Sequence, residues 1–275
     1  METQEIYSEV NKRYTTAAKG ADAKYGDSVA KAFGYSEQEL ATIPIEANLG
    51  LSCGNPLAIA TIREGETVVD LGSGAGFDVF HAANKVGPSG KVIGVDTNKA
   101  MLDKARKLRA DSGKMNTDFV ESCITKIALE SGIADCIISN CVVNLVPEGD
   151  KQLVFNEMFR MLRPGGRVAI SDILAKKPLP EEIKKSMALY VGCIAGASQV
   201  ADYELYLRQA GFKDILITDA SADLNVYKTA PGDVATGGCC GTASTAGSDT
   251  LSPSQIEDLD YNEWTGSYKI YAVKA

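Results

Sequence analysis

Three cysteines occupy positions where a thiol could take part in chemistry, although they are far apart in the sequence. Cys53 lies in a glycine-rich loop just before Asn55-Pro56, a pair typical of a helix start, where the helix N-terminus favours a thiolate. Cys141 follows an apolar segment that predicts a strand, and Cys193 lies in a second glycine-flanked loop. We therefore expect these thiols to converge, although any one of them taken singly is equally explained as an incidental thiol.

Three converging thiolates favour a soft, thiophilic ion. A structural zinc ion normally takes four ligands, often from C-x₂-C pairs, and the sequence contains no such pair. A site with three thiolates suits a trivalent pyramidal centre such as As(III), while zinc stays an alternative at this point.

A second candidate for chemistry is the glycine-rich segment Val68–Gly76, which predicts a strand, a tight turn and a helix beginning near Phe77. Its alternate glycines let a ligand approach the main chain at the positive end of that helix. Asp70 would repel a pyrophosphate but attract a cationic amino acid group. Asp96 ends the next predicted strand, where Rossmann-type folds hold ribose hydroxyls. We expect Asp70, Gly76 and Asp96 to line a cofactor site.

The spacing of these glycines is G-x-G-x-G and not the G-x-G-x-x-G of the dinucleotide fingerprint. This pattern resembles the motif of class I S-adenosylmethionine (SAM) methyltransferases. A glycine-rich turn with only a packing role is the alternative, and the strand and the two aspartates make that alternative weaker.

The remaining cysteines differ in their expected roles. Cys136 lies inside an apolar segment and is expected to be a buried small hydrophobe. Cys123 follows the third predicted strand, where this class of fold lines the adenine, so we expect it beside the cofactor base. Cys239 and Cys240 lie in 231–253, a segment rich in Gly, Ser, Thr and Ala that is expected to be flexible.

The elements that must position these residues alternate between strand and helix. The predicted strands are Thr67–Leu71, Lys91–Val95, Asp118–Ser122, Asp135–Ser139 and Arg167–Asp172. Strands that alternate with helices predict an α/β fold with a mostly parallel, doubly wound sheet. We divide the chain into 1–64, helical with the first cysteine loop; 65–175, Rossmann-like and SAM-binding; and 176–275, an added α+β region that binds substrate.

Outside this regular core the expectations concern single elements. Residues from Thr3 to about Ala32 predict a helix, with a break between Gly26 and Gly34. Leu224–Lys228 predicts a strand. His81, the single histidine, is expected on a surface helix without a catalytic role.

Composition limits the classes of function. The 275 residues carry a net charge of −8, which argues against a nucleic-acid partner because such proteins present a basic face. No apolar run is long enough to span a bilayer, and the polar segment Met1–Glu5 does not resemble a signal peptide. We expect a cytoplasmic protein with reduced cysteines and no membrane partner.

A family resemblance rests on the surroundings of the three cysteines. The segments Asn48–Pro56, Asp70–Asp78, Ile138–Leu145 and Tyr190–Ala197 resemble those of arsenite SAM-methyltransferases of the fungal-like, three-cysteine type, and Trp264–Val273 also fits. The resemblance covers about Asn48 to Phe212. It implies Cys53, Cys141 and Cys193 as catalytic As(III) ligands, and SAM contacts from Gly72, Ser73, Gly74, Asp96, Thr97, Met101, Ile124 and Asn140.

The resemblance also implies a reaction and its partners. Arsenite, or an As(III)–thiol complex, would be methylated in successive steps with no metal ion required, and a thiol reductant such as glutathione or the thioredoxin system would take part. Many members carry a fourth cysteine upstream that forms a disulfide during turnover, and here no cysteine precedes Cys53. That step must use another pair or an external thiol; Cys239-Cys240 is either an arsenic-handling motif or a spare one.

Two competing hypotheses remain at the level of sequence. One is a methyltransferase of a sterol, a quinone or a lipid headgroup, which would tolerate alkylation of its thiols. The other is a protein that sequesters As(III) without catalysis, which methylated arsenic in a reaction mixture would exclude.

Overall fold

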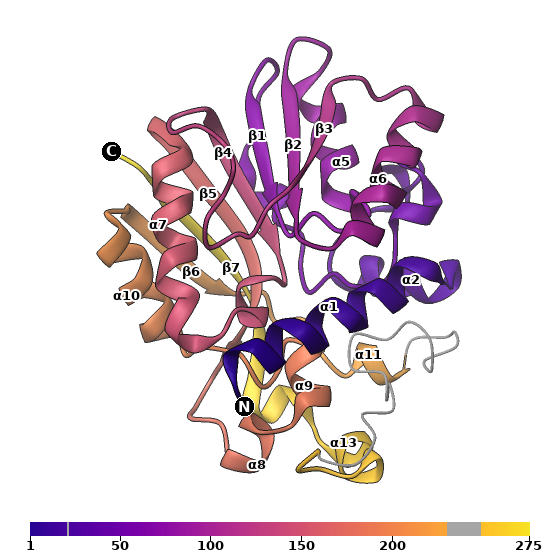
Figure 1. The fold of residues 1–275 in the computed structure, drawn as a ribbon, viewed down its shortest axis with the longest axis vertical. Helices are drawn as coiled ribbons and strands as arrows, with labels where there is room; N and C mark the ends of the chain where they lie inside the picture. The colour runs from indigo at the N-terminus through magenta and orange to yellow at the C-terminus, as the bar shows by residue number, and fades with distance from the viewer. Residues whose placement is uncertain (21, 230–248) are drawn as a thin grey trace.

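A seven-stranded sheet organises the computed structural model, which describes residues 1–20, 22–229 and 249–275 (Figure 1). The strand order is β3-β2-β1-β4-β5-β7-β6. The strands are β1 (Thr67–Leu71), β2 (Lys91–Asp96), β3 (Thr117–Glu121), β4 (Ala134–Asn140), β5 (Leu162–Ala175), β6 (Lys213–Asp219) and β7 (Thr265–Val273). β1 to β5 pair in parallel, and β7 runs antiparallel to both β5 and β6. This arrangement confirms the predicted Rossmann-like, mostly parallel α/β fold.

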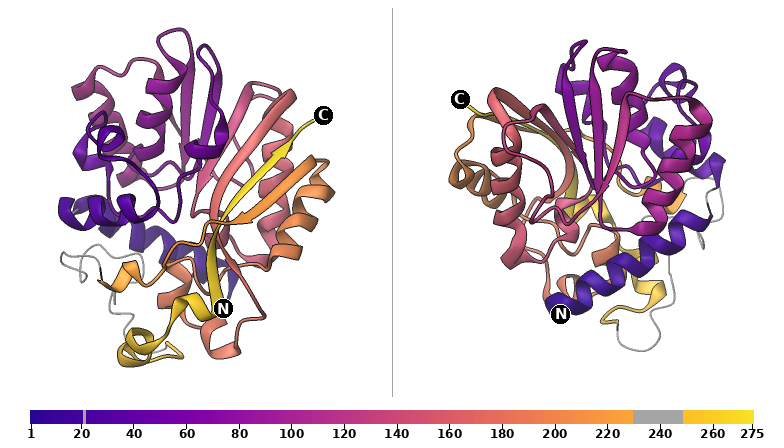
Figure 2. Two further views of the ribbon diagram at one scale, coloured as in Figure 1. Left: turned by 180° about the vertical axis from the view of Figure 1, so that it is seen from behind. Right: turned by 45° about the horizontal axis from the view of Figure 1, so that its top comes forward.

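Helices cover both faces of the sheet (Figures 1 and 2). The helices are α1 (Thr3–Lys19), α2 (Ala23–Ala32), α3 (Glu37–Leu40), α4 (Leu57–Ala60), α5 (Phe77–Val86), α6 (Lys99–Ser112), α7 (Lys151–Met161), α8 (Glu181–Lys184), α9 (Met187–Val191), α10 (Val200–Ala210), α11 (Val226–Thr229), α13 (Pro253–Asp258) and α14 (Tyr261–Trp264), with 3-10 turns η1 (Ile45–Ala47), η2 (Val143–Leu145) and η3 (Glu148–Asp150).

Neighbouring residues of a central strand pack into different apolar clusters, one on each face of the sheet. Val68 and Val92 pack with α4, α5 and α6 on one face, whereas Val69 and Ile93 pack with α7 and α10 on the other. Successive side chains of a strand point to opposite faces, so a strand covered on both sides is apolar throughout. This is why the runs of valine and isoleucine predicted β1 to β4 to within one residue at either end. The prediction for β5 was too short: Arg167–Asp172 was expected, and the strand runs from Leu162 to Ala175 because β7 pairs along it up to Ala175.

The N-terminal helix α1 crosses the end of the sheet where the parallel strands finish (Figures 1 and 2). It lies against α6, α9 and η2. A third apolar cluster joins α1, α2, α9, α11 and α13 below this edge, and it contains Cys53, Cys141 and Cys193. The three cysteines are therefore brought into one region by segments that are distant in sequence.

The structure corrects several predicted elements. The N-terminal helical region is two helices that separate after Lys19, and the region predicted as a break between Gly26 and Gly34 is helical through Ala32. Residues Leu224–Lys228 do not form a strand: α11 begins at Val226 and buries Tyr227 against Phe33. Alternating apolar residues alone did not distinguish these possibilities, because the packing partners come from distant segments.

His81 is not on a surface helix. It is 3% exposed and contacts the rings of Tyr35 and Phe77, which also contact each other. Burial lowers the pKa of His81 to about 4, so the imidazole is neutral near pH 7 and packs as an aromatic ring.

Residues 230–248 of the C-terminal region are outside the part of the chain that the structure describes. Cys239, Cys240 and most of the predicted flexible segment 231–253 lie outside the described residues, whereas Pro253 begins α13. The predicted division of the chain at 64 and 175 stays a prediction. Among the described helices, none is long and apolar enough to cross a bilayer.

Candidate active site

The glycine-rich turn between β1 and α5 forms a cradle at the end of the sheet. Gly72, Gly74 and Gly76 all have positive φ, at +70°, +51° and +92°, a backbone region that favours glycine. A Cβ at Gly72 would lie 2.4 Å from Cγ2 of Val142, so the turn rests directly against the residue that follows Cys141. The Oγ of Ser73 is buried against Gly94 of β2 and has no hydrogen-bond partner within the described residues.

Asp96 closes the side of this cradle. Its carboxylate accepts the N–H groups of Gly74 and Asn98, each at 2.8 Å. This fixes the carboxylate beside the glycine turn, at the position expected for a ribose-binding group. The N-cap of α6 is Asn98, whose side chain accepts from Met101 N. Thr97, just before it, lines the cavity.

Two buried carboxylates, Asp70 and Asp78, face the same cavity. Asp78 accepts hydrogen bonds from the hydroxyl of Tyr35 at 2.6 Å and the amide of Asn140 at 2.9 Å. Burial raises the pKa of Asp78 to about 6. Burial and the charges of Asp78 and Asp96 raise the pKa of Asp70 well above its usual value. A cationic ligand would relieve this repulsion, so the site fits a sulfonium or an ammonium group. Sequence reasoning assigned no role to Asp78.

The sulfurs of Cys53 and Cys141 meet beyond the end of β4, beside the part of β5 that carries Asp172. These sulfurs and a carboxylate oxygen of Asp172 all lie within 4.8 Å of one another, and all three residues are buried. Burial raises the pKa of Asp172 to about 7, and the hydroxyl of Tyr203 and the amide of Asn144 donate to its two oxygens. No role was predicted for Asp172, because an aspartate within an apolar strand carries no sequence signal for a neighbouring thiol.

Several side chains hold the loop that carries Cys53. The Cys53 N–H donates to Oδ1 of Asn140 at 3.1 Å. The hydroxyl of Ser267, on β7, donates to the Cys53 carbonyl at 2.6 Å, and that of Tyr227 donates to the Ser52 carbonyl at 2.9 Å. Asn140 therefore links the first cysteine loop to the carboxylate pair, since it also donates to Asp78.

Cys193 lies beside this pair of sulfurs but is turned to the main chain. Its thiol donates to the Cys141 carbonyl at 3.1 Å, and its sulfur is not part of the group formed by Cys53, Cys141 and Asp172. Cys141 and Cys193 have φ values of +60° and +66°. Left-handed backbone is uncommon for residues other than glycine and occurs at functional sites.

The structure gathers most of the predicted site residues around one cavity. Those that line it are Asp70, Gly72, Ser73, Gly74, Asp96, Thr97, Cys123, Ile124, Asn140 and Cys141. Gly76, Met101, Cys53 and Cys193 are not among the lining residues. Gly76 instead packs on Phe119, and Met101 is buried near Ala75.

Helix α1 covers this cavity, which the sequence did not indicate. Tyr7, Asn11 and other residues of α1 line it. The Asn98 amide donates to the Asn11 carbonyl at 2.9 Å, and the Tyr7 hydroxyl donates to Asp150 at 3.0 Å. Helix α1 therefore forms one wall of the cavity, across the ends of the strands (Figure 1).

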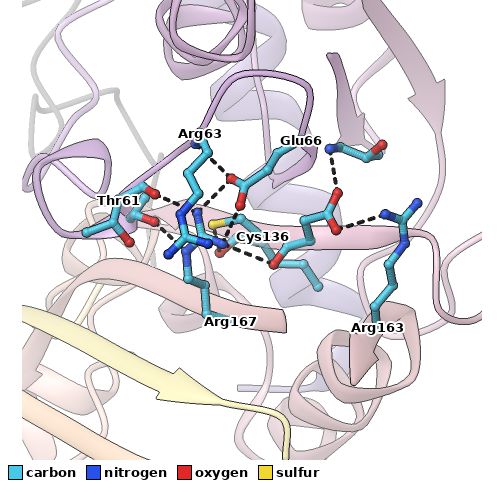
Figure 3. Close-up of polar contacts among 10 residues, drawn as sticks. Thr61, Arg63, Glu66, Cys136, Arg163 and Arg167 are labelled. Carbon is cyan, nitrogen blue, oxygen red and sulfur yellow. Dashed lines mark hydrogen bonds and ion pairs between the residues drawn. The ribbon is translucent and has the colours of Figure 1, made fainter. Parts of the chain in front are cut away.

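Cys136 is separate from these thiols, as predicted. It pairs with Val68 and Arg167 near the amino ends of the strands, whereas the other site residues follow the carboxyl ends. Figure 3 shows it beside the ion pair of Arg167 with Glu66, in which the two groups approach to 2.7 Å. Burial raises the pKa of Cys136 to about 12, so it is a neutral thiol. No two of the five described cysteines are joined by a disulfide.

Comparison with known proteins identifies the fold family. Residues 62–211, more than half of the chain, match the family described as "Methyltransferase domain". The chain belongs to this methyltransferase family. The matched residues include the glycine turn, Asp96, Cys141 and Cys193, but not Cys53. The prediction that this protein is a methyltransferase is confirmed.

Individual relatives of this methyltransferase narrow the comparison. "Arsenite methyltransferase" of Halobacterium salinarum is 45% identical over 206 residues, which cover 70% of this chain and 52% of the relative. The human protein of that name is 35% identical over 170 residues, 58% of this chain and 44% of the relative. The chain thus spans about half the length of these curated relatives.

A solved structure also resembles this methyltransferase. CrArsM, an arsenic (III) S-adenosylmethionine methyltransferase from Chlamydomonas reinhardtii, superposes with a TM-score of 0.58 and 27% identity, covering 90% of this chain and 73% of that one. The two proteins therefore share their fold over more of this chain than residues 62–211, which match the family.

Proposed function

We propose that this methyltransferase transfers the methyl group of SAM to trivalent arsenic held by Cys53, Cys141 and Cys193, in arsenic detoxification. The observation that carries the proposal is the meeting of the Cys53 and Cys141 sulfurs, with Cys141 on the wall of the cavity that the glycine turn also lines and Val142 packed against Gly72. The names of the relatives support it, since those named above are described as arsenite or arsenic(III) methyltransferases.

The proposed cosubstrate site uses the residues around the cavity. The Asp70–Asp78 pair faces the cationic end of the ligand, the glycine turn gives its main chain to the amino acid part, and Asp96 accepts from the ribose hydroxyls. Cys123 and Ile124 lie on the cavity wall, beside the base. When bound, SAM supplies an electrophilic methyl group.

The proposed substrate site uses the soft sulfur ligands. Arsenic arrives as arsenite or a thiol complex and exchanges onto Cys141 and Cys53, and Cys193 joins when its thiol leaves the Cys141 carbonyl. The thiolates hold arsenic so that its lone pair faces the methyl group, and no proton has to leave the nucleophile. Catalysis then comes mainly from positioning, which reaches about 7–11 kcal/mol in well-oriented reactions. In methyl transfer the arsenic lone pair would form the As–C bond while SAM leaves as S-adenosylhomocysteine, which takes arsenic from As(III) to As(V). Two equivalents of an external thiol such as glutathione, or the thioredoxin dithiol, would then reduce the arsenic to As(III) and be released as a disulfide.

The test is a reaction of protein, SAM, arsenite and glutathione, with the products separated by chromatography and detected as arsenic. We expect methylated arsenic, and we expect Cys141→Ser and Cys193→Ser each to abolish it while the affinity for SAM stays within about twofold. Cys136→Ala is the matched control because this buried thiol lies near the opposite end of the strands. Full activity in either serine variant, or no methylated product from the native chain, overturns the proposal.

A further inference from the structure

The side chain of Asn144 connects strand β5, beside Cys53 and Cys141, to the loop that carries Cys193. It lies in η2, three residues after Cys141, and it is fully buried. Its single amide nitrogen donates to Oδ1 of Asp172 at 3.0 Å, to the carbonyl of Ile173 at 2.5 Å and to the carbonyl of Cys193 at 3.2 Å. The end of β5 and the Cys193 loop are thus joined through one side chain.

The Cys193 loop also touches the main chain of Asn144. A Cβ at Gly196 would lie 2.0 Å from the Asn144 carbonyl oxygen, so only glycine permits this approach. The other end of the loop is held by the buried amine of Lys151, which donates to the Gly196 carbonyl at 2.6 Å and to the Ser198 hydroxyl at 2.7 Å. The loop is therefore fixed at both ends by buried donors.

These contacts oppose a backbone strain. The φ of +66° at Cys193 is unfavourable for a residue with a Cβ, and such conformations persist only where the surroundings determine them. The carbonyl that Asn144 holds belongs to Cys193 itself. Without that hydrogen bond, the backbone is free to relax towards an ordinary conformation and to carry the thiol away from Cys141.

We propose that Asn144 is the positioning residue that keeps Cys193 within reach of Cys53 and Cys141 as the third arsenic ligand; this rests on the proposed function. In the described structure the Cys193 thiol is bonded to the Cys141 carbonyl. Because Asn144 fixes the backbone and not the side chain, the thiol leaves that carbonyl by rotation about its own Cα–Cβ bond. The sulfurs of Cys53 and Cys141 thus already lie together, and the Cys193 sulfur reaches them by side-chain rotation while its backbone stays in place.

The test counts the sulfurs bound to arsenic. X-ray absorption at the arsenic edge, with arsenite as the probe and external thiol removed, should give three As–S bonds in the native protein and two in Asn144→Ala. Arsenite binding should weaken by about tenfold, as expected for the loss of a buried hydrogen-bond network, while SAM affinity is unchanged. The matched control is Asn116→Ala, which loses two amide bonds to the Ala83 and Gly87 carbonyls away from the thiols.

If Asn144→Ala does not fold, it will not bind SAM. A second variant then tests the same inference. Gly196→Ala keeps Asn144 but forces the loop from its main chain, and it should also give two As–S bonds. Three As–S bonds in a folded Asn144→Ala protein, or in Gly196→Ala when the first variant does not fold, overturn the inference. Failure of the native chain to bind arsenite through sulfur would instead refute the proposed function.

Discussion

The buried pair Asp70 and Asp78 makes the affinity for SAM depend on pH. In the ligand-free protein, burial raises the pKa of Asp78 to about 6, and that of Asp70 is raised by burial and by the neighbouring aspartates. A cation in the cavity favours the ionised carboxylates, so protons compete with SAM. The dissociation constant for SAM should therefore increase as the pH falls through 6.

The size of the effect follows from the protonated fraction. At about pH 5, one unit below the pKa of Asp78, roughly nine tenths of that carboxyl is protonated. If only the ionised form binds SAM, the dissociation constant is about tenfold higher than at pH 7.5, a difference of about 1.4 kcal/mol. Proton binding by Asp70 acts in the same direction and increases the difference.

Isothermal titration calorimetry between about pH 5 and pH 8 measures this dependence, and buffers of different ionisation enthalpy count the protons released. Asp78→Asn should reduce the pH dependence, because its side chain keeps its shape without a titrating group. Asp103→Asn, an exposed carboxylate on α6, is the matched control and should behave as the native protein. A constant affinity across this range, or an unaltered dependence in Asp78→Asn, would refute the reasoning.

Three further predictions concern other carboxylates. Asp96→Asn should weaken SAM binding about tenfold or more, because the charged acceptor beside Gly74 is lost; equilibrium dialysis checks this, and unchanged affinity contradicts the ribose role. Glu66→Gln should lower the free energy of unfolding by about 2–4 kcal/mol, since the Arg167 guanidinium, 10% exposed, loses its charged partner; a loss below about 0.5 kcal/mol in urea denaturation would contradict this. The pKa of Asp172 is about 7, above its unfolded value, so stability should fall as the pH rises from about 4 to 8; melting temperatures should show a smaller fall in Asp172→Asn, and an equal fall would show that another group is responsible.

The central strands could be predicted because their environment is uniform. β1 was predicted with the observed bounds, and β2 differs by one residue, since a strand covered on both faces is apolar along its whole length. The helices and strands near the two ends of the chain were predicted less accurately, because their apolar residues contact partners far away in sequence. Tyr227, for example, packs on Phe33 and donates to the Ser52 carbonyl, and nothing local distinguishes that helix from a strand.

The site could be predicted as far as residue types and strand ends define it. The sulfurs of Cys53 and Cys141 lie close together, as predicted. Cys141 follows β4, whereas Cys53 lies in the loop between η1 and α4 that Ser267 and Tyr227 hold in place. The orientation of the Cys193 thiol depends on a left-handed backbone and on the buried amide of Asn144, which no spacing rule reports. Asp172 lies within β5, paired with Tyr268 of β7, so only the folded sheet brings its carboxylate to the sulfurs.

The hydroxyl of Ser267 that holds the Cys53 carbonyl has a consequence for biosynthesis. Strand β7 fills the gap between β5 and β6, and it is made long after the first cysteine loop leaves the ribosome. The thiol site is therefore completed only when residues 265–273 have been translated and inserted into the sheet. Nascent chains that stop short of β7 should form the glycine turn but lack the hydrogen bond that holds the Cys53 loop.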